Sequence, residues 1–136
     1  MHVPQELRYT KSHEWVKSSG PAVGGTGGEV VVGITAHAQE ELRDVVYVEL
    51  PAVGKAVKQG EAAAVVESVK AAFDIYAPVS GTVTRVNAAL GQSPQLVNKD
   101  CYAEGWFFAL KPTNPGELNG LMTSDQYTQL IQAGAH

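Results

Sequence analysis

The stretch AAAVVESVKAAFDIYAPV, residues 62–79, decides how this chain folds. Two apolar runs, at 62–66 and 73–79, flank a short segment that ends at Lys70 and Ala71. Two such runs with a short connection are typical of a β-hairpin, which places Lys70 at the tip. A lysine on a rigid, exposed turn can be read by a modifying enzyme, and acylation removes its charge and lengthens the side chain. Lys70 is therefore the first candidate for function.

Composition narrows the class of protein. A chain of 136 residues suits one domain, and 44% apolar with 18% charged residues indicates an ordered core. The 14 glycines and 7 prolines favour many turns and a mainly β fold. The net charge of −4 provides no basic footprint for nucleic acid, so we expect no nucleic-acid partner. A single cysteine excludes an internal disulfide and a thiolate zinc cluster, and we expect no metal.

The start of the chain and its apolar runs bear on location. Residues 1–6 lack the basic and apolar regions of a signal peptide, and they do not resemble an Arg- and Ser-rich transit peptide. No apolar run approaches the ~20 residues of a membrane span. We expect a soluble protein that does not bind membranes. It would lie in the cytoplasm of a bacterium, or in the mitochondrial matrix if the chain is a mature organellar form.

Local patterns upstream of the hairpin predict strands and one helix. Residues 8–17 alternate as a strand would, with Trp15 in the core, and the glycine-rich residues 18–28 predict a mobile hairpin loop. Thr35 follows the β-branched strand 29–34 and is a suitable N-cap for a two-turn helix at 36–42. A strand at 45–50 follows, and strict alternation would place three of its apolar residues on one face: Val46, Val48 and Leu50.

The middle of the chain contains a weak repeat in which a proline is followed by a glycine and a strand. Residues 51–57 and 78–86 each lead from a proline through a glycine into a strand, which predicts a pseudo-symmetric pair of sheets with Lys70 midway. Ser93 and Pro94 predict the start of another short helix.

The C-terminal part changes from strand to helical patterns. Residues 106–110 predict a last strand, and Asn114 precedes a proline that opens one helical turn. Thr123 and Gln126 form a capping-box pattern before an amphipathic helix that Gly134 ends. We therefore expect a single domain over residues 1–136, with a β core at about 9–111 and a helical segment at about 114–133.

Several motifs together resemble one family. YTKSHEWV at 9–16, VGITAHAQEEL at 32–42, VVYVELPAVGKAVKQGE at 45–61 and VVESVKA at 65–71 appear in order, followed by PVSGTVTRVN at 78–87, LVN at 96–98 and EGW at 104–106. These segments resemble the H protein of the glycine cleavage system over nearly the whole chain. The resemblance implies a lipoyl/biotinyl-type barrel-sandwich hybrid with short helices and a C-terminal helix.

The resemblance also implies a cofactor and partners. In H proteins the lysine of ESVKA carries lipoic acid in amide linkage, and Lys70 stands at that position. The lipoyl arm takes electrons and an aminomethyl group from the pyridoxal-phosphate glycine decarboxylase (P protein). It delivers the one-carbon unit to the tetrahydrofolate-dependent aminomethyltransferase (T protein) and is reoxidised by dihydrolipoamide dehydrogenase (L protein). Lipoate-attaching enzymes complete the set, and the chain itself would be a non-catalytic, monomeric carrier.

Further residues gain a role only from this family. Glu67 and Gly81 match positions that lipoylating enzymes are thought to read, although a turn alone would account for the glycine. Residues near the loaded arm match Ser12, Glu14, His37 and Asp74, which would line a cleft that shields the arm from water. A carboxylate or hydroxyl there could accept hydrogen bonds from a primary ammonium. Phe73 replaces a small polar residue beside this set and could narrow the cleft.

Other readings of the sequence stay open. A biotin carrier would place methionine on both sides of the lysine, where this chain has Val69 and Ala71, and lipoyl domains of dehydrogenases have long linkers. An enzyme built on Glu14, His37 and Cys101 has no motif to position those groups. A lipoyl donor or relay for other lipoate-dependent complexes remains the alternative function.

Overall fold

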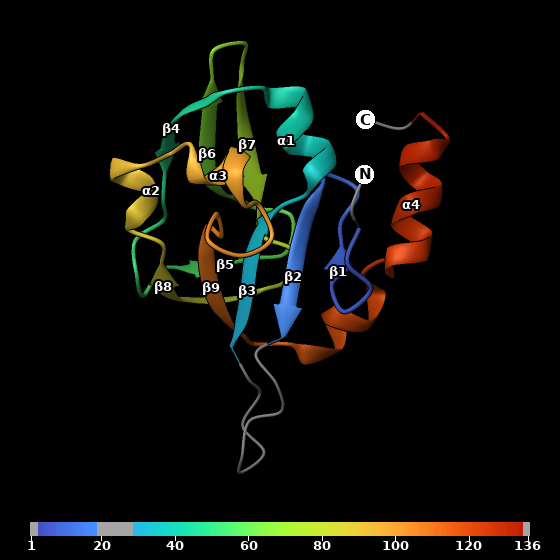
Figure 1. The fold of residues 1–136 in the computed structure, drawn as a ribbon. Helices are drawn as coiled ribbons and strands as arrows, with labels where there is room; N and C mark the ends of the chain where they lie inside the picture. The colour runs from blue at the N-terminus through green and yellow to red at the C-terminus, as the bar shows by residue number, and fades with distance from the viewer. Residues whose placement is uncertain (1–2, 19–28, 135–136) are drawn as a thin grey trace.

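A computed structural model describes residues 3–18 and 29–134 and shows two antiparallel sheets with short helices around them (Figure 1). The larger sheet has the strand order β1-β2-β3-β9-β8-β5, and the smaller has the order β4-β6-β7. The prediction of a mainly β fold is confirmed. The strands are β1 (Arg8–Tyr9), β2 (Glu14–Ser18), β3 (Val30–Ile34), β4 (Val45–Glu49), β5 (Ala56–Val57), β6 (Ala62–Ser68), β7 (Ala72–Tyr76), β8 (Gly81–Val86) and β9 (Phe108–Pro112). The helices are α1 (Ala36–Leu42), α2 (Ala89–Gln92), α3 (Leu96–Lys99), the 3₁₀ helix η1 (Pro115–Gly120) and α4 (Ser124–Gln132).

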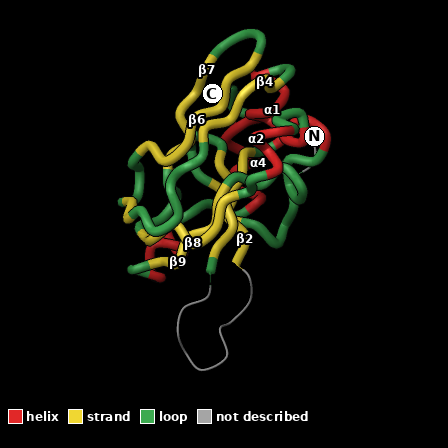
Figure 2. Tube along the Cα trace, turned by 90° about the vertical axis from the view of Figure 1, so that its left-hand side faces the viewer, coloured by secondary structure: helices red, strands yellow, loops and turns green. Residues whose placement is uncertain are grey.

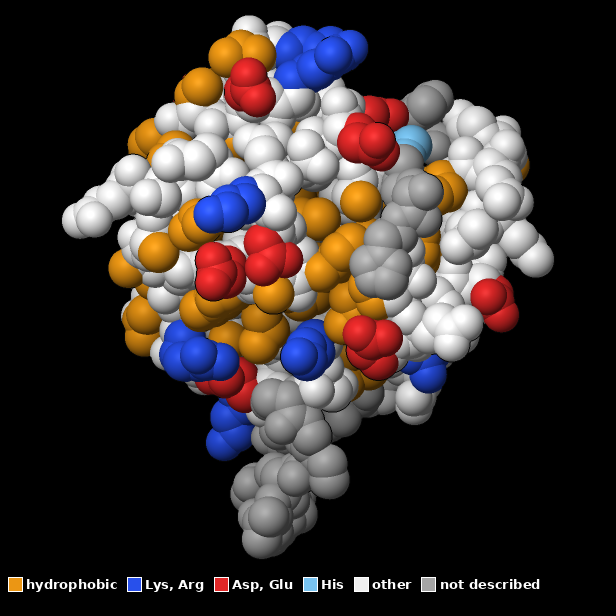
Figure 3. All heavy atoms as spheres, in the orientation of Figure 1, with side chains coloured by type: hydrophobic (Ala, Val, Ile, Leu, Met, Phe, Trp, Pro, Cys, Tyr) orange, Lys and Arg blue, Asp and Glu red, His pale blue; other side chains and the backbone are white. Residues whose placement is uncertain are grey.

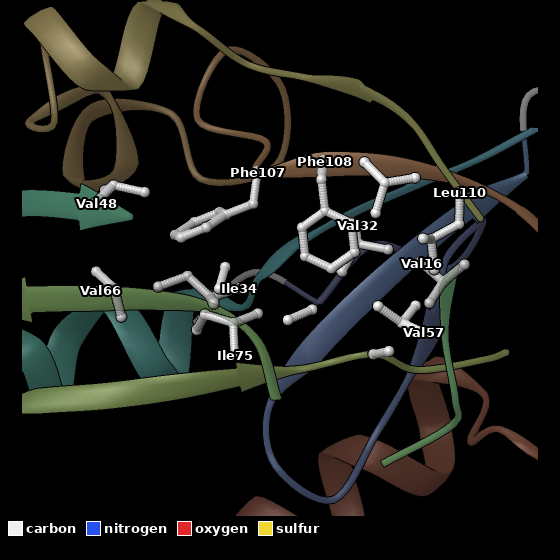
Figure 4. Close-up of a cluster of buried hydrophobic side chains, with 14 of the residues drawn as sticks. Val16, Val32, Ile34, Val48, Val57, Val66, Ile75, Phe107, Phe108 and Leu110 are labelled. Atoms are coloured by element: carbon white, nitrogen blue, oxygen red, sulfur yellow. The ribbon is translucent and has the colours of Figure 1, made fainter. Parts of the chain in front are cut away.

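The core lies between the two sheets (Figure 4). Val66 and Ile75 face inward from the small sheet, and Val32 and Phe108 meet them from the large one. Burying a side chain of this size stabilises the fold by roughly 1.5–3 kcal/mol, so this layer contributes most of the driving force. A second, smaller cluster under α4 comprises Leu7, Tyr9, Trp15 and Tyr127, which confirms the prediction that Trp15 is a core residue.

The hairpin predicted at residues 62–79 is present. β6 pairs with β7, with Glu67 opposite Ala72 and Val66 opposite Phe73. The two strands extend beyond the rest of the small sheet, so that their connection projects from one end of the molecule (Figures 1 and 2). Lys70 lies in this connection and is exposed.

The single strand predicted at residues 8–17 is wrong, because the chain turns back on itself there. β1 and β2 pair with each other, Tyr9 opposite Trp15, around a turn that ends at His13. His13 has a φ of 72°, in the left-handed region that few residues other than glycine adopt, so alternation along the sequence could not continue through it.

The faces predicted for β4 are also wrong in part. Val48 is buried, but Val46 is 53% exposed, although alternation would place both on one face. The register of β4 against β6 shifts between Val45 and Tyr47. A β-bulge of this kind inserts one residue and reverses the faces on one side of it.

Helix caps explain which helical predictions succeed. Thr35 accepts a hydrogen bond from the N–H of Ala38 and begins α1 as predicted, and Thr123 forms the predicted capping box with Gln126 at the start of α4. The helix expected to begin at Ser93 instead begins at Leu96, after a residue whose side chain makes no capping bond. Gly134 has a φ of 82° just beyond α4.

The similar units at residues 51–57 and 78–86 were predicted to form a pair of sheets, but their strands, β5 and β8, lie side by side in one sheet. β5 and β8 pair with Ala56 opposite Thr82.

The last strand runs from Phe108 to Pro112, two residues later than predicted. Apart from Ser18, the predicted loop at 18–28 lies outside the described residues. Within the described chain, no helix is long and apolar enough to cross a membrane.

Candidate functional site

The turn that carries Lys70 is fixed by its own hydrogen bonds. Ser68 donates its backbone N–H to the carbonyl of Ala71 at 2.8 Å. The hydroxyl of Ser68 accepts the N–H groups of Lys70 and Ala71, both at 3.1 Å. The N–H of Val69 reaches the carbonyl of Asp44 at 3.1 Å, which ties the tip to the segment after α1. The backbone of the tip is therefore held in one conformation.

The Lys70 side chain itself is available. Among the described residues, none forms an ion pair or hydrogen bond with its ammonium group. Val69 beside it is 68% exposed. Figure 3 shows a basic surface at the upper end of the molecule, beside hydrophobic and acidic side chains, and the β6–β7 hairpin projects at that end in Figure 1. A rigid turn with an exposed primary amine is what an enzyme that acylates this lysine would need.

A cleft of about 340 Å³ begins three residues from the lysine, at Phe73. It runs between β7 and α1, and the turn of Ser12 and His13 closes one end. Because three residues span at most about 10 Å even when fully extended, Phe73 is within reach of an acylated Lys70 side chain. The lining comprises Ser12, His13, Ile34, Ala38, Glu41, Leu42, Val66, Phe73, Asp74, Ile75 and Tyr76.

The cleft lining is mainly apolar, and its polar members are Ser12, His13, Glu41 and Asp74. Val66 lies directly opposite Phe73 in the β6–β7 pair, so both belong to the cleft face, and alternation adds Ile75. Asp74 pairs with Val65, and alternation places both on the outer face of the sheet. Asp74 lines a second hollow on that side as well as the rim of the cleft.

Glu14 is not part of the cleft lining and instead lines a neighbouring hollow that shares Ser12 and Tyr76 with the cleft. Its side chain is buried, and it accepts the hydroxyl of Ser12 at 2.6 Å and the backbone N–H of Tyr76 at 3.1 Å. The Thr10 hydroxyl also donates to it, at 2.5 Å. Burial raises the pKa of this carboxyl above its ordinary value, while the hydrogen bonds from Ser12 and Thr10 act in the opposite direction.

His37 lies on α1, outside the cleft lining. Its ring packs against that of His13 with centroids 4.7 Å apart, and its Nε2 atom is 3.2 Å from a carboxylate oxygen of Glu41. His13 and Glu41 do line the cleft. The structure thus brings Ser12 and Asp74 to the cleft itself. Glu14 and His37 do not line it but contact residues that do.

The two residues matched to lipoylation recognition lie in different sheets. Glu67 is exposed on β6, three residues from the lysine, opposite Ala72. Gly81 begins β8 in the large sheet, where a Cβ atom would lie 2.5 Å from the carbonyl oxygen of Lys111. Close approach of two backbones therefore gives Gly81 a packing role of its own.

Cys101 is buried beneath the large sheet. Its carbonyl accepts the indole N–H of Trp15 at 2.8 Å, and burial raises the pKa of its thiol to about 11. A thiol in that state is a poor nucleophile near neutral pH. Among residues 3–18 and 29–134, no group of three or more His, Cys, Asp or Glu could hold a metal ion.

Sequence reasoning missed His13, Glu41 and Tyr76 as part of the site. Glu41 could have been found, because it lies one helical turn after His37. His13 could not, because its contact with Tyr127 joins residues 114 apart in the sequence.

Two antiparallel sheets that enclose one core and present a lysine on a hairpin tip define a carrier domain of the lipoyl type. The model of the family described as "Glycine cleavage H-protein" matches residues 7–134. The chain belongs to this family.

Relatives and a solved structure agree with this assignment. The chain is 53% identical to the glycine cleavage system H protein of Nitrosomonas europaea, over all of both sequences. It is 50% identical to that of Thermus thermophilus, over 99% of this chain and 100% of the relative. The crystal structure of a glycine cleavage system H protein from Mycobacterium marinum aligns with a TM-score of 0.83 at 38% identity, over 97% of this chain and 99% of the other. The chain is accordingly a lipoyl carrier of the glycine cleavage system.

Proposed function

We propose that Lys70 is the residue that carries lipoate, in amide linkage to its Nζ atom. The observation that supports this most directly is the tip: an exposed ammonium that pairs with no group among residues 3–18 and 29–134, on a turn that Ser68 fixes by hydrogen bonds. Amide formation converts a cation into a neutral side chain, so Lys70 loses no ion pair with the described part of the chain on modification.

The shape and chemistry of the cleft fit an attached acyl chain. Val66, Phe73 and Ile75 offer an apolar surface to the chain, and Ser12 offers a hydroxyl at the far end. When attached, lipoate supplies a disulfide that is reduced as it takes up the aminomethyl group derived from glycine. The residues of this chain bind and orient the arm and exclude water from its cargo.

The carrier role assigns the partners and the location. P protein loads the arm, T protein unloads it, L protein reoxidises it, and a lipoate-attaching enzyme modifies Lys70 at the start. The chain itself is non-catalytic in this cycle, which takes place in the cytoplasm. Glu67 beside the tip and Gly81 serve recognition by the attaching enzyme. Ser12, Glu14, His37 and Asp74 shape the cleft or its support.

Intact-mass analysis of protein made in a host that attaches lipoate tests the proposal. Wild type gains the mass of one lipoyl group, and Lys70→Arg gains none, because an arginine keeps the charge but lacks the primary amine. Lys58→Arg, at an exposed lysine in another turn, is the matched control and is modified like wild type. Mixed with P protein and glycine, only the modified proteins support decarboxylation. Modification of Lys70→Arg, or its retained activity, would refute the assignment.

A further inference from the structure

We infer that Tyr127, on the C-terminal helix, is a positioning residue for the cleft, which it shapes through His13 and the start of α1. The inference rests on the proposed function, because it assigns the cleft the task of sheltering the cargo of the arm. The hydroxyl of Tyr127 lies 2.7 Å from Nδ1 of His13 and 2.7 Å from Oγ1 of Thr35. His13 lines the cleft, and Thr35 caps the helix that forms one wall.

The hydrogen bonds among the side chains of Tyr127, His13 and Thr35 depend on the hydroxyl of Tyr127. A phenol has one proton to donate and lone pairs with which to accept, so it can serve one neighbour as donor and the other as acceptor. Thr35 Oγ1 already accepts the N–H of Ala38 at 3.3 Å, which leaves its own proton for Tyr127. Burial raises the pKa of Tyr127, so the hydroxyl stays protonated. Phenylalanine at this position would remove the hydrogen bonds that His13 and Thr35 each make with the Tyr127 hydroxyl.

His13 is the point at which this network meets the cleft. Its φ of 72° is unfavourable for a residue with a Cβ atom, and such a conformation persists only where the surroundings impose it. The backbone of His13 is held on both sides, by the carbonyl of Thr10 at 3.2 Å and the N–H of Thr35 at 3.0 Å. Tyr127 adds the bond to the side chain and thereby sets the direction of the ring.

The ring of His13 also contacts α1, so its orientation affects the position of that helix. It packs on His37 with centroids 4.7 Å apart, and His37 contacts Glu41, which lines the cleft one turn further along. A change in the Tyr127 hydroxyl is therefore expected to move cleft groups at both ends of α1. Lys70 lies on the other side of the cleft, in the connection between β6 and β7, and its modification is expected to be unaffected.

Tyr127→Phe and Tyr102→Phe form a matched pair. Tyr127 stacks on Tyr9 with centroids 4.7 Å apart, and phenylalanine keeps that stacked ring. Tyr102 also has a hydroxyl at the start of α1, where it accepts the N–H of Ala36 at 3.0 Å. However, Tyr102 lines a different hollow, beside Trp15 and Trp106. Loss of either hydroxyl removes an anchor of α1, but only the first removes the bond to His13.

The experiment uses wild type and both variants, each modified to completion as judged by intact mass. The ¹⁵N signals of the His13 ring and the rate at which the loaded carrier loses its one-carbon unit without T protein are measured. Tyr127→Phe should shift the His13 Nδ1 signal and shorten the lifetime of the loaded form several-fold, and Tyr102→Phe should do neither. His13→Asn, which tolerates the left-handed backbone, should shorten the lifetime as Tyr127→Phe does.

An unchanged His13 signal in Tyr127→Phe would overturn the inference, as would equal lifetimes in Tyr127→Phe and Tyr102→Phe. The proposed function fails separately, if wild type gains no lipoyl group. In that case the His13 signal of the unmodified proteins still decides whether Tyr127 positions the cleft.

Discussion

The Oε2 atom of Glu14 lies 3.1 Å from the backbone nitrogen of Tyr76 and accepts its N–H. Glu14 belongs to β2 in the large sheet, and Tyr76 belongs to β7 at the edge of the small one. This bond therefore joins the two sheets next to the cleft, at an edge where the β7 backbone would otherwise lack a partner. A buried carboxylate in this position acts as a clamp, and its ionisation is linked to stability.

We predict that the stability advantage of wild type over Glu14→Gln shrinks as pH rises. Burial raises the pKa of Glu14 in the folded protein above its ordinary value of 4.5. The folded state then binds the proton more tightly than the unfolded state, so the contribution of Glu14 is fully present below pH 4.5. It is lost as pH rises through the folded-state pKa. Urea unfolding of both proteins over this range measures the difference.

Glu104→Gln, at an exposed carboxylate, controls for a general effect of removing one negative charge. An advantage of wild type that grows with pH would show that the hydrogen bonds from Ser12, Thr10 and Tyr76 outweigh burial.

Ser68→Ala should loosen the tip without unfolding the domain. The hydroxyl of Ser68 joins three hydrogen bonds within the turn, to the backbone groups of Lys70 and Ala71. The loss of each bond costs about 1 kcal/mol, since a typical hydrogen bond makes a net contribution of ~0.5–1.5 kcal/mol. We expect attachment of lipoate to slow several-fold, because the lysine is presented in more than one conformation. Initial rates by intact mass measure the effect.

Ser93→Ala is the comparison, since no hydrogen bond of the Ser93 side chain is present among the described residues. If Ser68→Ala is modified as fast as Ser93→Ala, the order of the turn is irrelevant to the attaching enzyme.

Gly81→Ala separates packing from recognition. The added Cβ would lie 2.5 Å from the carbonyl oxygen of Lys111 and 3.2 Å from the Cα of Pro112, both in the backbone of β9. We expect a loss of roughly 1–3 kcal/mol in the free energy of unfolding, as for an overpacked core. Gly91→Ala, in α2 with nothing within 4 Å of the new Cβ, should be neutral or stabilising by about 0.5–1 kcal/mol.

The folded fraction of Gly81→Ala then reports on recognition. If it accepts lipoate at the wild-type rate, Gly81 is required only for the close contact of β8 and β9. A folded protein that is modified slowly would support the recognition role.

Short-range signals in the sequence were sufficient for the features nearest the lysine. The hairpin around Lys70 and the caps at Thr35 and Thr123 depend on residues a few positions apart, and the structure confirms all three. The lipoyl-type fold itself was inferred from motifs that match a known family, and two sheets around one core confirm it.

Features set by tertiary structure were not predictable in the same way. The bulge that exposes Val46 arises from the register between β4 and β6. The left-handed φ of His13 is stabilised by contacts with Thr35 and Tyr127, which follow far later in the chain. No local pattern contains such information, so the support of the cleft could be described only from the structure.

Phe73→Ala should shorten the lifetime of the loaded carrier more than Asp74→Ala does. Phe73 pairs with Val66 on the cleft face of the small sheet, whereas Asp74 pairs with Val65 on the outer face and reaches the cleft only at its rim. Phe73 is 48% exposed, so its truncation opens the cleft to water without leaving a cavity in the core. Both variants should accept lipoate normally. The loss of the one-carbon unit, followed by intact mass without T protein, compares them. A larger effect of Asp74→Ala would show that a carboxylate at the rim, and not the apolar wall, protects the cargo.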